Sequence, residues 1–265
     1  MPNKLNSDLI NSAIKYYIEN EISIKKCSER FGIGASTLSR YLKKEKVELK
    51  KINLKKYTYN EDFFQVIDSE NKAYWLGFIA ADGCINKTNN LEISLAIKDK
   101  SHLEKFIQDI DGDIAMLKTT ENKARVFVCS VKLVKDLEQY GISNNKTFSF
   151  NSIPNLNDEL IPHFLRGYFD GDGSISTNGT NRNGSRKWAL NLIATKEFIE
   201  EWQEYFTKLG ITKVSIQQKG DMRVWNKCGI NQITTILNHL YSNSNVYLSR
   251  KFERANEIFA VLGES

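Results

Sequence analysis

Apolar residues recur at helical spacing in three short segments near the start of the chain. The pattern predicts a first helix over residues 7–18, a second that begins at Ser23 and a third over residues 35–44. Gly32 lies between the second and third helices and can take the positive backbone angle of a tight turn. Residues 1–52 are therefore predicted to form a small all-α domain that ends in a linker.

The third predicted helix carries polar and basic residues opposite its apolar face. Helix-turn-helix domains typically contain two short helices joined by a glycine-containing turn, and the second of these helices has a polar and basic outer face. The segment SIKKCSERFGIGASTLSRYLKK resembles the helix-turn-helix of resolvases, transposases and many regulators. The resemblance implies DNA contacts from the outer face of the third helix, namely Ser36, Thr37, Ser39, Arg40 and Lys43. A plain helical packing module is the alternative.

Lysine and arginine crowd residues 40–56, which read RYLKKEKVELKKINLKK. Residues 46–60 show no helical periodicity, so this stretch is interpreted as a basic linker with a domain boundary near residue 52. A phosphate backbone is the commonest partner of such a run. A solvated linker without a partner is the alternative.

From residue 61 onward, one pattern of helices and strands occurs twice. The first copy opens with NKAYWLGFIAADGCI and the second with IPHFLRGYFDGDGSI. In each copy the opening helix is followed by two strand-like runs, a helix, two further strand-like runs and a second helix. The third strand-like run is DIAMLKT in the first copy and KVSIQQK in the second. The order αββαββα, written over residues 53–150 and 151–265, predicts an α+β protein with pseudo-twofold symmetry. It excludes a simple parallel α/β sheet.

Small residues form a stripe along the opening helix of each copy. In the first copy Gly77 is followed one turn later by Ala80 and Ala81, and in the second Gly167 is followed by Gly171. Glycine inside a helix costs about 0.5–1 kcal/mol relative to alanine, so its presence in both copies calls for a reason. Close packing of the two helices against each other would supply one.

Parallel packing of these helices would bring together Asp82 and Asp172, which end them and precede Gly83 and Gly173. A helix C-terminus carries partial negative charge, and two carboxylates there repel each other, so a cation is required. Carboxylates that converge with backbone carbonyls suit Mg²⁺. Paired carboxylates with two divalent ions are a recurring arrangement for phosphodiester cleavage. The alternative is that both are ordinary turn-forming aspartates.

The composition of the chain excludes some classes of protein but does not indicate a function by itself. Of 265 residues, 26% are charged, and the net charge of +5 permits nucleic-acid binding without establishing it. No apolar run reaches the roughly 20 residues of a membrane helix, and the first residues lack a signal-like apolar stretch. The four cysteines, Cys27, Cys84, Cys129 and Cys228, form no C-x-x-C pair, which fits a reducing compartment. We therefore expect an intracellular protein, cytoplasmic or organellar or phage-encoded, that is not secreted.

The two Asp-Gly segments, with the repeat around them, resemble the LAGLIDADG motif over residues 61–265. The pattern is similar to single-chain, two-motif LAGLIDADG homing endonucleases with an added DNA-binding module. The resemblance implies that Asp82 and Asp172 bind metal, with backbone carbonyls near Ala81 and Gly171 completing the coordination. It also implies that Lys146 and Lys251 border the water pocket and assist catalysis. Asp170 has no acidic counterpart in the first copy, which has Ala80 there, so it is not expected to bind metal.

The resemblance further implies that the four strands of each half form a saddle along DNA. Alternation in the first half places Leu91, Ile93, Leu95 and Ile97 toward the helices and Glu92, Ser94 and Lys98 outward. In the second half, Lys187, Asn191, Arg223 and Lys227, with Gln217 and Lys219, are candidate groove contacts. The loop STNGTNRNGSRK, residues 176–187, is long and basic enough to extend down the groove.

Together these expectations describe a monomeric, site-specific endonuclease of intron homing type. It would cut both strands of a long, asymmetric double-stranded DNA target with two or more Mg²⁺ ions, using Asp82, Asp172, Lys146 and Lys251. Two alternatives stay open. One is an RNA maturase that binds its own intron RNA, and the other is a transcription regulator with a silent LAGLIDADG scaffold.

Overall fold

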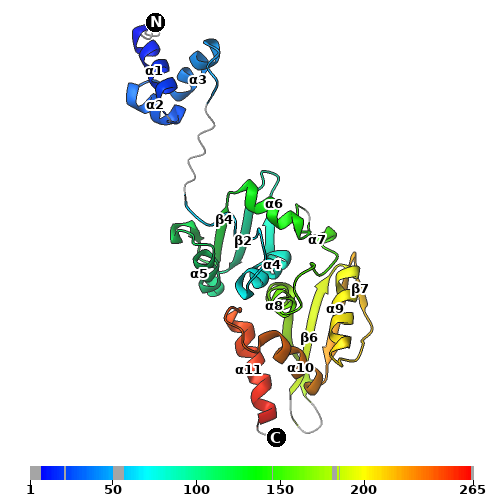
Figure 1. Ribbon diagram of the computed structural model, residues 1–265. Helices are drawn as coiled ribbons and strands as arrows, with labels where there is room; N and C mark the ends of the chain where they lie inside the picture. Colours follow the sequence, from blue (N-terminus) through cyan, green and yellow to red (C-terminus); the bar gives the residue numbers. More distant parts are fainter. Residues whose placement is uncertain are drawn as a thin grey trace. The chain divides into compact units, whose positions relative to one another are not determined.

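The computed structural model describes residues 7–20, 22–49, 57–144, 146–180, 184 and 186–263. The chain divides into two compact units, residues 1–56 and 57–265, each of which is described by itself (Figure 1). The domain boundary expected near residue 52 lies outside the described residues. Within the part of the chain that is described, no helix is long and apolar enough to cross a membrane.

The first unit consists of the three helices predicted from the sequence. They are α1 (Ser7–Glu19), α2 (Ile24–Phe31) and α3 (Ala35–Lys44). The Ser23 side chain accepts a hydrogen bond from the Lys26 amide and so begins α2, while Gly32 ends it with a φ of 63°. Their apolar faces meet in a core of Ile10, Ala13, Ile14, Tyr17, Cys27, Ile33, Leu38 and Leu42.

The second unit contains two halves with the same order of elements. The first half has α4 (Glu70–Asp82), β1 (Gly83–Ile85), β2 (Leu91–Ala96), α5 (Lys100–Asp109), β3 (Leu117–Thr119), β4 (Lys123–Val128), α6 (Val131–Gln139) and α7 (Lys146–Ser149). The second has α8 (Ile161–Asp172), β5 (Ser174–Thr180), β6 (Arg186–Ala194), α9 (Lys196–Lys208), β7 (Gln217–Lys219), β8 (Met222–Cys228), α10 (Ile230–Tyr241) and α11 (Ser249–Gly263). The predicted α+β class and the αββαββα order are confirmed.

Each half forms one four-stranded antiparallel sheet, with strand orders β1-β2-β4-β3 and β5-β6-β8-β7. In β2 the residues Leu91, Ile93 and Leu95 are buried, as the alternation predicts, and one face of each sheet packs on its helices. The runs expected to give the third strand of each half contribute only three residues each, β3 and β7. Ahead of β3, the Asp113 carboxylate accepts from the Ala115 amide and begins a 3₁₀ turn instead.

Helices α4 and α8 pack backbone to backbone at the centre of this unit (Figure 1). A Cβ added to Gly77 would lie 2.0 Å from the carbonyl oxygen of Phe164, and one added to Gly167 would lie 1.9 Å from that of Tyr74. A Cβ on Gly171 would lie 2.3 Å from the Cβ of Ala81. These pairings run in the same direction along both helices, so the helices are parallel and their C-terminal ends meet.

The glycines after the two helices do not have the left-handed backbone expected of a helix-ending glycine. Gly83 has a φ of −71° and Gly173 a φ of −75°. Glycine is required there by space, since a Cβ on Gly83 would lie 2.7 Å from the carbonyl oxygen of Ile79 and one on Gly173 would lie 2.2 Å from the ring of Phe169. The chain turns straight from helix into strand β1 or β5, which anchors each sheet to a helix end.

Candidate active site

The ends of α4 and α8 bring two acidic side chains to one exposed place. Asp82 is the last residue of α4 and Asp172 the last of α8, and both are exposed. Although both residues are accessible to solvent, the protein packed around the carboxyl group of Asp172 partly desolvates it, and this desolvation and then the charge of Asp82 raise its pKa to about 6. Burial also raises the pKa of Asp82, against the lowering effect of Lys251 and Lys146. The effect of the Asp82 charge on the pKa of Asp172 indicates that the two carboxylates lie close enough to repel each other.

Two buried lysines reach the same helix ends from beneath. The Lys146 ammonium of α7 donates to the carbonyl oxygens of Ala80, at 2.7 Å, and Ala81, at 2.5 Å. The Lys251 ammonium of α11 donates to the carbonyl oxygens at the end of α8, namely those of Phe169 (2.6 Å), Asp170 (2.7 Å), Gly171 (3.4 Å) and Gly173 (2.5 Å). Each lysine therefore satisfies carbonyls that the helix leaves unpaired and offsets the negative end of its dipole.

The environment of both lysines lowers their pKa and so favours the neutral amine more than in water. Burial lowers the pKa of Lys251 to about 8, although the charge of Asp170 opposes the change. Burial also lowers the pKa of Lys146, against the charges of Asp172 and Asp82. The carbonyls of Ala81 and Gly171, expected near a metal, thus face ammonium groups. Among the described residues, no group of three or more His, Cys, Asp or Glu side chains is placed to hold a metal ion, so the acidic pair is the candidate donor set.

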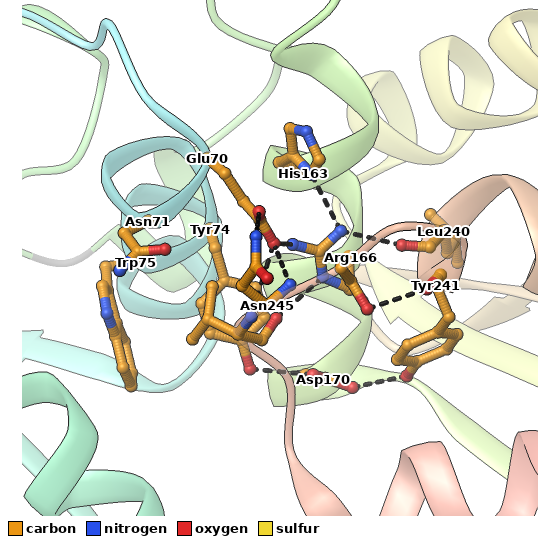
Figure 2. Close-up of polar contacts among 12 residues, drawn as sticks. Glu70, Asn71, Tyr74, Trp75, His163, Arg166, Asp170, Leu240, Tyr241 and Asn245 are labelled. Carbon is orange, nitrogen blue, oxygen red and sulfur yellow. Dashed lines mark hydrogen bonds and ion pairs between the residues drawn. The ribbon is translucent and has the colours of Figure 1, made fainter.

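Asp170, two residues before the end of α8, belongs to a buried network and not to the exposed pair Asp82 and Asp172. Its carboxylate accepts from the hydroxyls of Tyr74, at 2.8 Å, and Tyr241, at 2.5 Å, and from the Leu248 amide at 2.7 Å (Figure 2). Because Leu248 directly precedes α11, Asp170 ties the start of that helix to α8. The sequence carries a signal of this separate role, since Ala80 occupies the position in the first copy.

A second buried polar contact joins the two helices near their N-terminal ends. Figure 2 shows Arg166 of α8 directed at Glu70 of α4, with an Nη2–Oε1 distance of 2.7 Å. The guanidinium, which is fully buried, also donates to the carbonyl oxygens of Leu240 and Val246. The first copy has Leu76 at the position of Arg166, so this contact also has no counterpart in the other half.

Replacing Arg166 with methionine is expected to destabilise the second unit by about 3–5 kcal/mol. The change removes one partner of a buried ion pair and leaves two carbonyls unpaired, and such losses are large. Arg254→Met is the matched control, because Arg254 forms an exposed pair with Glu257 at 2.8 Å, and exposed pairs contribute at most about 1 kcal/mol. Urea unfolding followed by tryptophan fluorescence measures both; equal losses would show that Arg166 does not hold the helices together.

The outward faces of the sheets carry some of the predicted DNA contacts but not others. Lys98 is exposed in a 3₁₀ turn after β2, and Lys187 and Asn191 lie on the outward face of β6, because Trp188, Leu190 and Leu192 fill the core. Lys227 was wrongly placed there. It is buried, and its ammonium donates at 2.6 Å to the carbonyl and hydroxyl oxygens of Thr212 on the helix side.

Arg223 is also corrected by the alternation of β8. It shares its face of the strand with buried Trp225 and Lys227, while Asn226 points to the outward face and donates to Asn191. Residues that the sequence reasoning missed on the outward faces are Lys118, Lys123, Arg125, Phe127 and Asn226. Side chains alternate between the two faces of a strand, so extending this alternation to β3, β4 and β8 would have identified these residues. The candidates in the later strands were chosen by residue type instead.

In the first unit, the predicted contact face of α3 is accessible. Ser36, Arg40 and Lys43 are exposed, and Thr37 and Ser39 are partly exposed. The buried side chains of the helix, Leu38 and Leu42, lie on the opposite side. The helix therefore presents a polar and basic surface of the kind that enters a DNA groove in helix-turn-helix proteins.

Comparison with known proteins gives matches to three domain families. Residues 159–251 match the LAGLIDADG-like domain, residues 71–145 match the WhiA LAGLIDADG-like domain, and residues 7–51 match the helix-turn-helix, Psq domain. An uncharacterized protein of Methanocaldococcus jannaschii is 28% identical over 180 residues, which are 66% of this chain and 67% of the relative.

Solved structures show the same fold. The I-LtrWI LAGLIDADG homing endonuclease bound to target DNA matches with a TM-score of 0.52 and 13% identity, over 78% of this chain and 92% of that one. Meganuclease I-SmaMI bound to uncleaveable DNA matches with a TM-score of 0.50 and 13% identity, over 75% and 91%. The chain thus contains two LAGLIDADG-like domains preceded by a helix-turn-helix domain, as its matches to the three family models show.

Proposed function

We propose that this protein is a site-specific homing endonuclease that cuts both strands of a long, asymmetric double-stranded DNA target with divalent metal. The observation that carries the proposal is the meeting of Asp82 and Asp172 at the ends of two helices packed in parallel. Two acids, one from each half, provide one donor for each strand of a duplex. Because the halves differ in sequence and lie in one chain, the target need not be palindromic and the protein can act as a monomer.

The acidic pair fits a divalent cation. Both carboxylates are exposed, and the charge of Asp82 helps to raise the pKa of Asp172, so a cation between them would relieve a repulsion. Two carboxylates provide the hard oxygen donors that Mg²⁺ prefers. When bound, the ions would supply charge stabilisation at the scissile phosphates and a more acidic water.

Lys146 and Lys251 would act from the protein side of this site. Each ammonium is held at a helix end by carbonyl oxygens, next to the acids, in an environment that lowers its pKa. Lys251, with a pKa of about 8, can hold a proton for the leaving oxygen or orient water at neutral pH. Their charge also offsets charge that builds on a phosphate during attack.

DNA contacts would come from the outward faces of the two sheets and from α3. Lys98, Lys187 and Asn191 are accessible on the second unit, and Arg40 and Lys43 on the first. Lysine and arginine would neutralise phosphates, which contributes affinity without sequence preference. The outward strands would carry the sequence preference, since a two-stranded ribbon fits the major groove.

Cleavage selection from a randomised DNA library with Mg²⁺ tests the function directly. The full chain is incubated with the library, and cut ends are captured and sequenced, in parallel with selection for binding in Ca²⁺. We expect one long, non-palindromic site to be enriched in both experiments. A protein that enriches a bound site yet cuts nothing in Mg²⁺ or Mn²⁺ would contradict the nuclease and favour a regulator.

Deletion of residues 1–52 is expected to weaken binding without moving the cut. The first unit offers phosphate contacts that add affinity outside the cleavage site, so we expect at least about a tenfold loss at physiological salt. Fluorescence anisotropy gives the affinity, and end mapping gives the cut positions. The Arg40→Ala/Lys43→Ala double variant, in which the unit keeps its fold, should lose part of the same affinity. Displaced cut positions would contradict the assignment of chemistry to the second unit.

A further inference from the structure

The first cross-strand row beyond each Asp-Gly pair differs in chemistry between the halves. In the first half, Cys84 pairs with Glu92 across β1 and β2, and Glu92 pairs with Phe127 across β2 and β4. Cys84 follows Asp82 and Gly83 immediately, so this row is the part of the sheet nearest the acids. All three side chains point away from the core, because Leu91, Ile93, Val126 and Val128 on either side of them are buried.

The matching row of the second half is Ser174, Asn191 and Asn226, which are Cα partners across β5, β6 and β8. Its polar groups bond to one another. Asn226 donates to the side-chain oxygen of Asn191, and Asn191 donates to the Ser176 hydroxyl at 3.1 Å. The two amides of this row are therefore bonded to each other and to Ser176 further along β5, whereas the first half presents a carboxylate beside a phenyl ring.

Glu92 keeps acceptor capacity for a ligand. Its carboxylate lies 3.8 Å from Arg125, a distance of ionic attraction but too long for a hydrogen bond, and the side chain is 29% exposed. Lys118, Lys123 and Arg125 occupy the neighbouring outward positions of β3 and β4 and suit phosphates. A carboxylate among them would be repelled by a phosphate, so its favourable partner is a donor on a base edge. In the major groove that donor is the N4 amino group of cytosine, or N6 of adenine.

Phe127 is the apolar member of the row. It is 38% exposed on a face whose neighbours are polar or charged. Burying a phenyl ring against an apolar group is favourable, and the apolar group that the major groove offers is the C5 methyl of thymine. Since Glu92 and Phe127 are directly opposite each other on antiparallel strands, the two would read adjacent base positions.

We propose that Glu92 and Phe127 are a specificity-determining pair that reads an amino-bearing base, cytosine first, beside a thymine in one half-site, near the centre of the whole target. The inference rests on the proposed function, since it needs the outward sheet face to lie in the major groove. The second half, with Asn191 and Asn226, would read its half-site with amide chemistry instead. The different side chains of the two rows nearest the cut would then make the target asymmetric.

Binding selection in Ca²⁺ with the full chain tests the pair through two substitutions. Glu92→Gln should shift the preference at one position from cytosine toward adenine, by about five- to a hundredfold, because glutamine pairs with the N6 and N7 of adenine. Phe127→Ala should relax the thymine preference at the adjacent position several-fold. Controls on surfaces away from the sheet face are Glu104→Gln on α5 and Val131→Ala on α6, which should leave both preferences unchanged.

A second measurement changes the DNA, and its main comparison uses the wild-type protein, so it does not depend on the folding of a variant. Single thymines of the selected site are replaced one at a time by uracil, which lacks the methyl group. Wild type should lose affinity several-fold at the position read by Phe127, while Phe127→Ala should not discriminate there. Unchanged preferences in both variants, together with no uracil effect near the centre, would overturn the pair. Failure of wild type to select any sequence would instead contradict the proposed function.

Discussion

Asp172→Asn is expected to reduce DNA cleavage by about 10³-fold or more while leaving DNA binding intact. The amide keeps the size of the side chain but removes the charge that would hold a divalent ion at the end of α8. Binding should be retained or slightly tighter, because one negative charge facing the phosphates is lost. Cleavage of the selected site under single-turnover conditions and anisotropy in Ca²⁺ separate the two effects. Asp82→Asn should behave in the same way.

The same substitution is expected to stabilise the metal-free protein above pH 6. Folding raises the pKa of Asp172 to about 6 from its ordinary value of 3.8, so the folded state favours the protonated form. Stability is therefore lost as the pH rises from the unfolded to the folded pKa, and the whole penalty is present above pH 6. Because solvent screens a charge at this exposed position, only about 1 kcal/mol is expected, and in a domain of this size that raises the melting temperature of the variant at pH 8 by roughly 2–4 °C.

Asp111→Asn is the matched control for both measurements. Asp111 is exposed and has a φ of 50°, a conformation that asparagine also tolerates. It should change neither cleavage nor the pH dependence of melting. Normal cleavage by Asp172→Asn, or a melting temperature that does not depend on Mg²⁺ in wild type, would remove the acidic pair from the proposed chemistry.

Gly167→Ala is expected to prevent the second unit from folding, and Gly77→Ala to have nearly as large an effect. A methyl group on Gly167 would lie 1.9 Å from the carbonyl oxygen of Tyr74, inside the contact between two helix backbones. Backbone atoms cannot turn aside as a flexible side chain can, so α4 and α8 must separate. Overpacking in a core already costs about 1–3 kcal/mol where side chains can adjust, and here the cost is larger.

Circular dichroism and the yield of soluble protein measure this effect. Gly34→Ala serves as the control, since Gly34 has an ordinary backbone and a Cβ there would lie 3.6 Å from the Thr37 hydroxyl, an ordinary contact. It should fold normally. A well-folded Gly167→Ala protein with unchanged stability would mean that the helices do not meet at this glycine.

Local patterns in the sequence predicted the elements and their repetition well. The three helices of the first unit follow from apolar spacing and from Ser23 and Gly32, all of which act within one turn. The α4–α8 contact was predictable because glycine appears at equivalent places in both copies, where a helix would otherwise avoid it. The meeting of Asp82 and Asp172 followed from that contact.

Features that depend on distant partners were not predictable in the same way. Arg166 and Asp170 bind groups in α4, α10 and the segment before α11, and no spacing in the sequence points to those partners. Lys227 was assigned to the DNA face by its charge, but its position in β8 places it beneath the sheet with Trp225. The charge of a side chain shows that it could contact DNA, whereas its position in the alternation of the strand decides which face of the sheet it lies on.

The contacts of Arg166 and Asp170 also limit how such proteins can be recombined. Two copies of the second half, joined as a homodimer, would place two arginines and two aspartates at the helix interface without Glu70 and Tyr74, the groups that satisfy them in this chain. The two halves are thus too different at this interface to be exchanged freely. A chimaera that pairs this second half with a foreign first half should assemble only if the foreign helix brings a carboxylate and a tyrosine to those two positions.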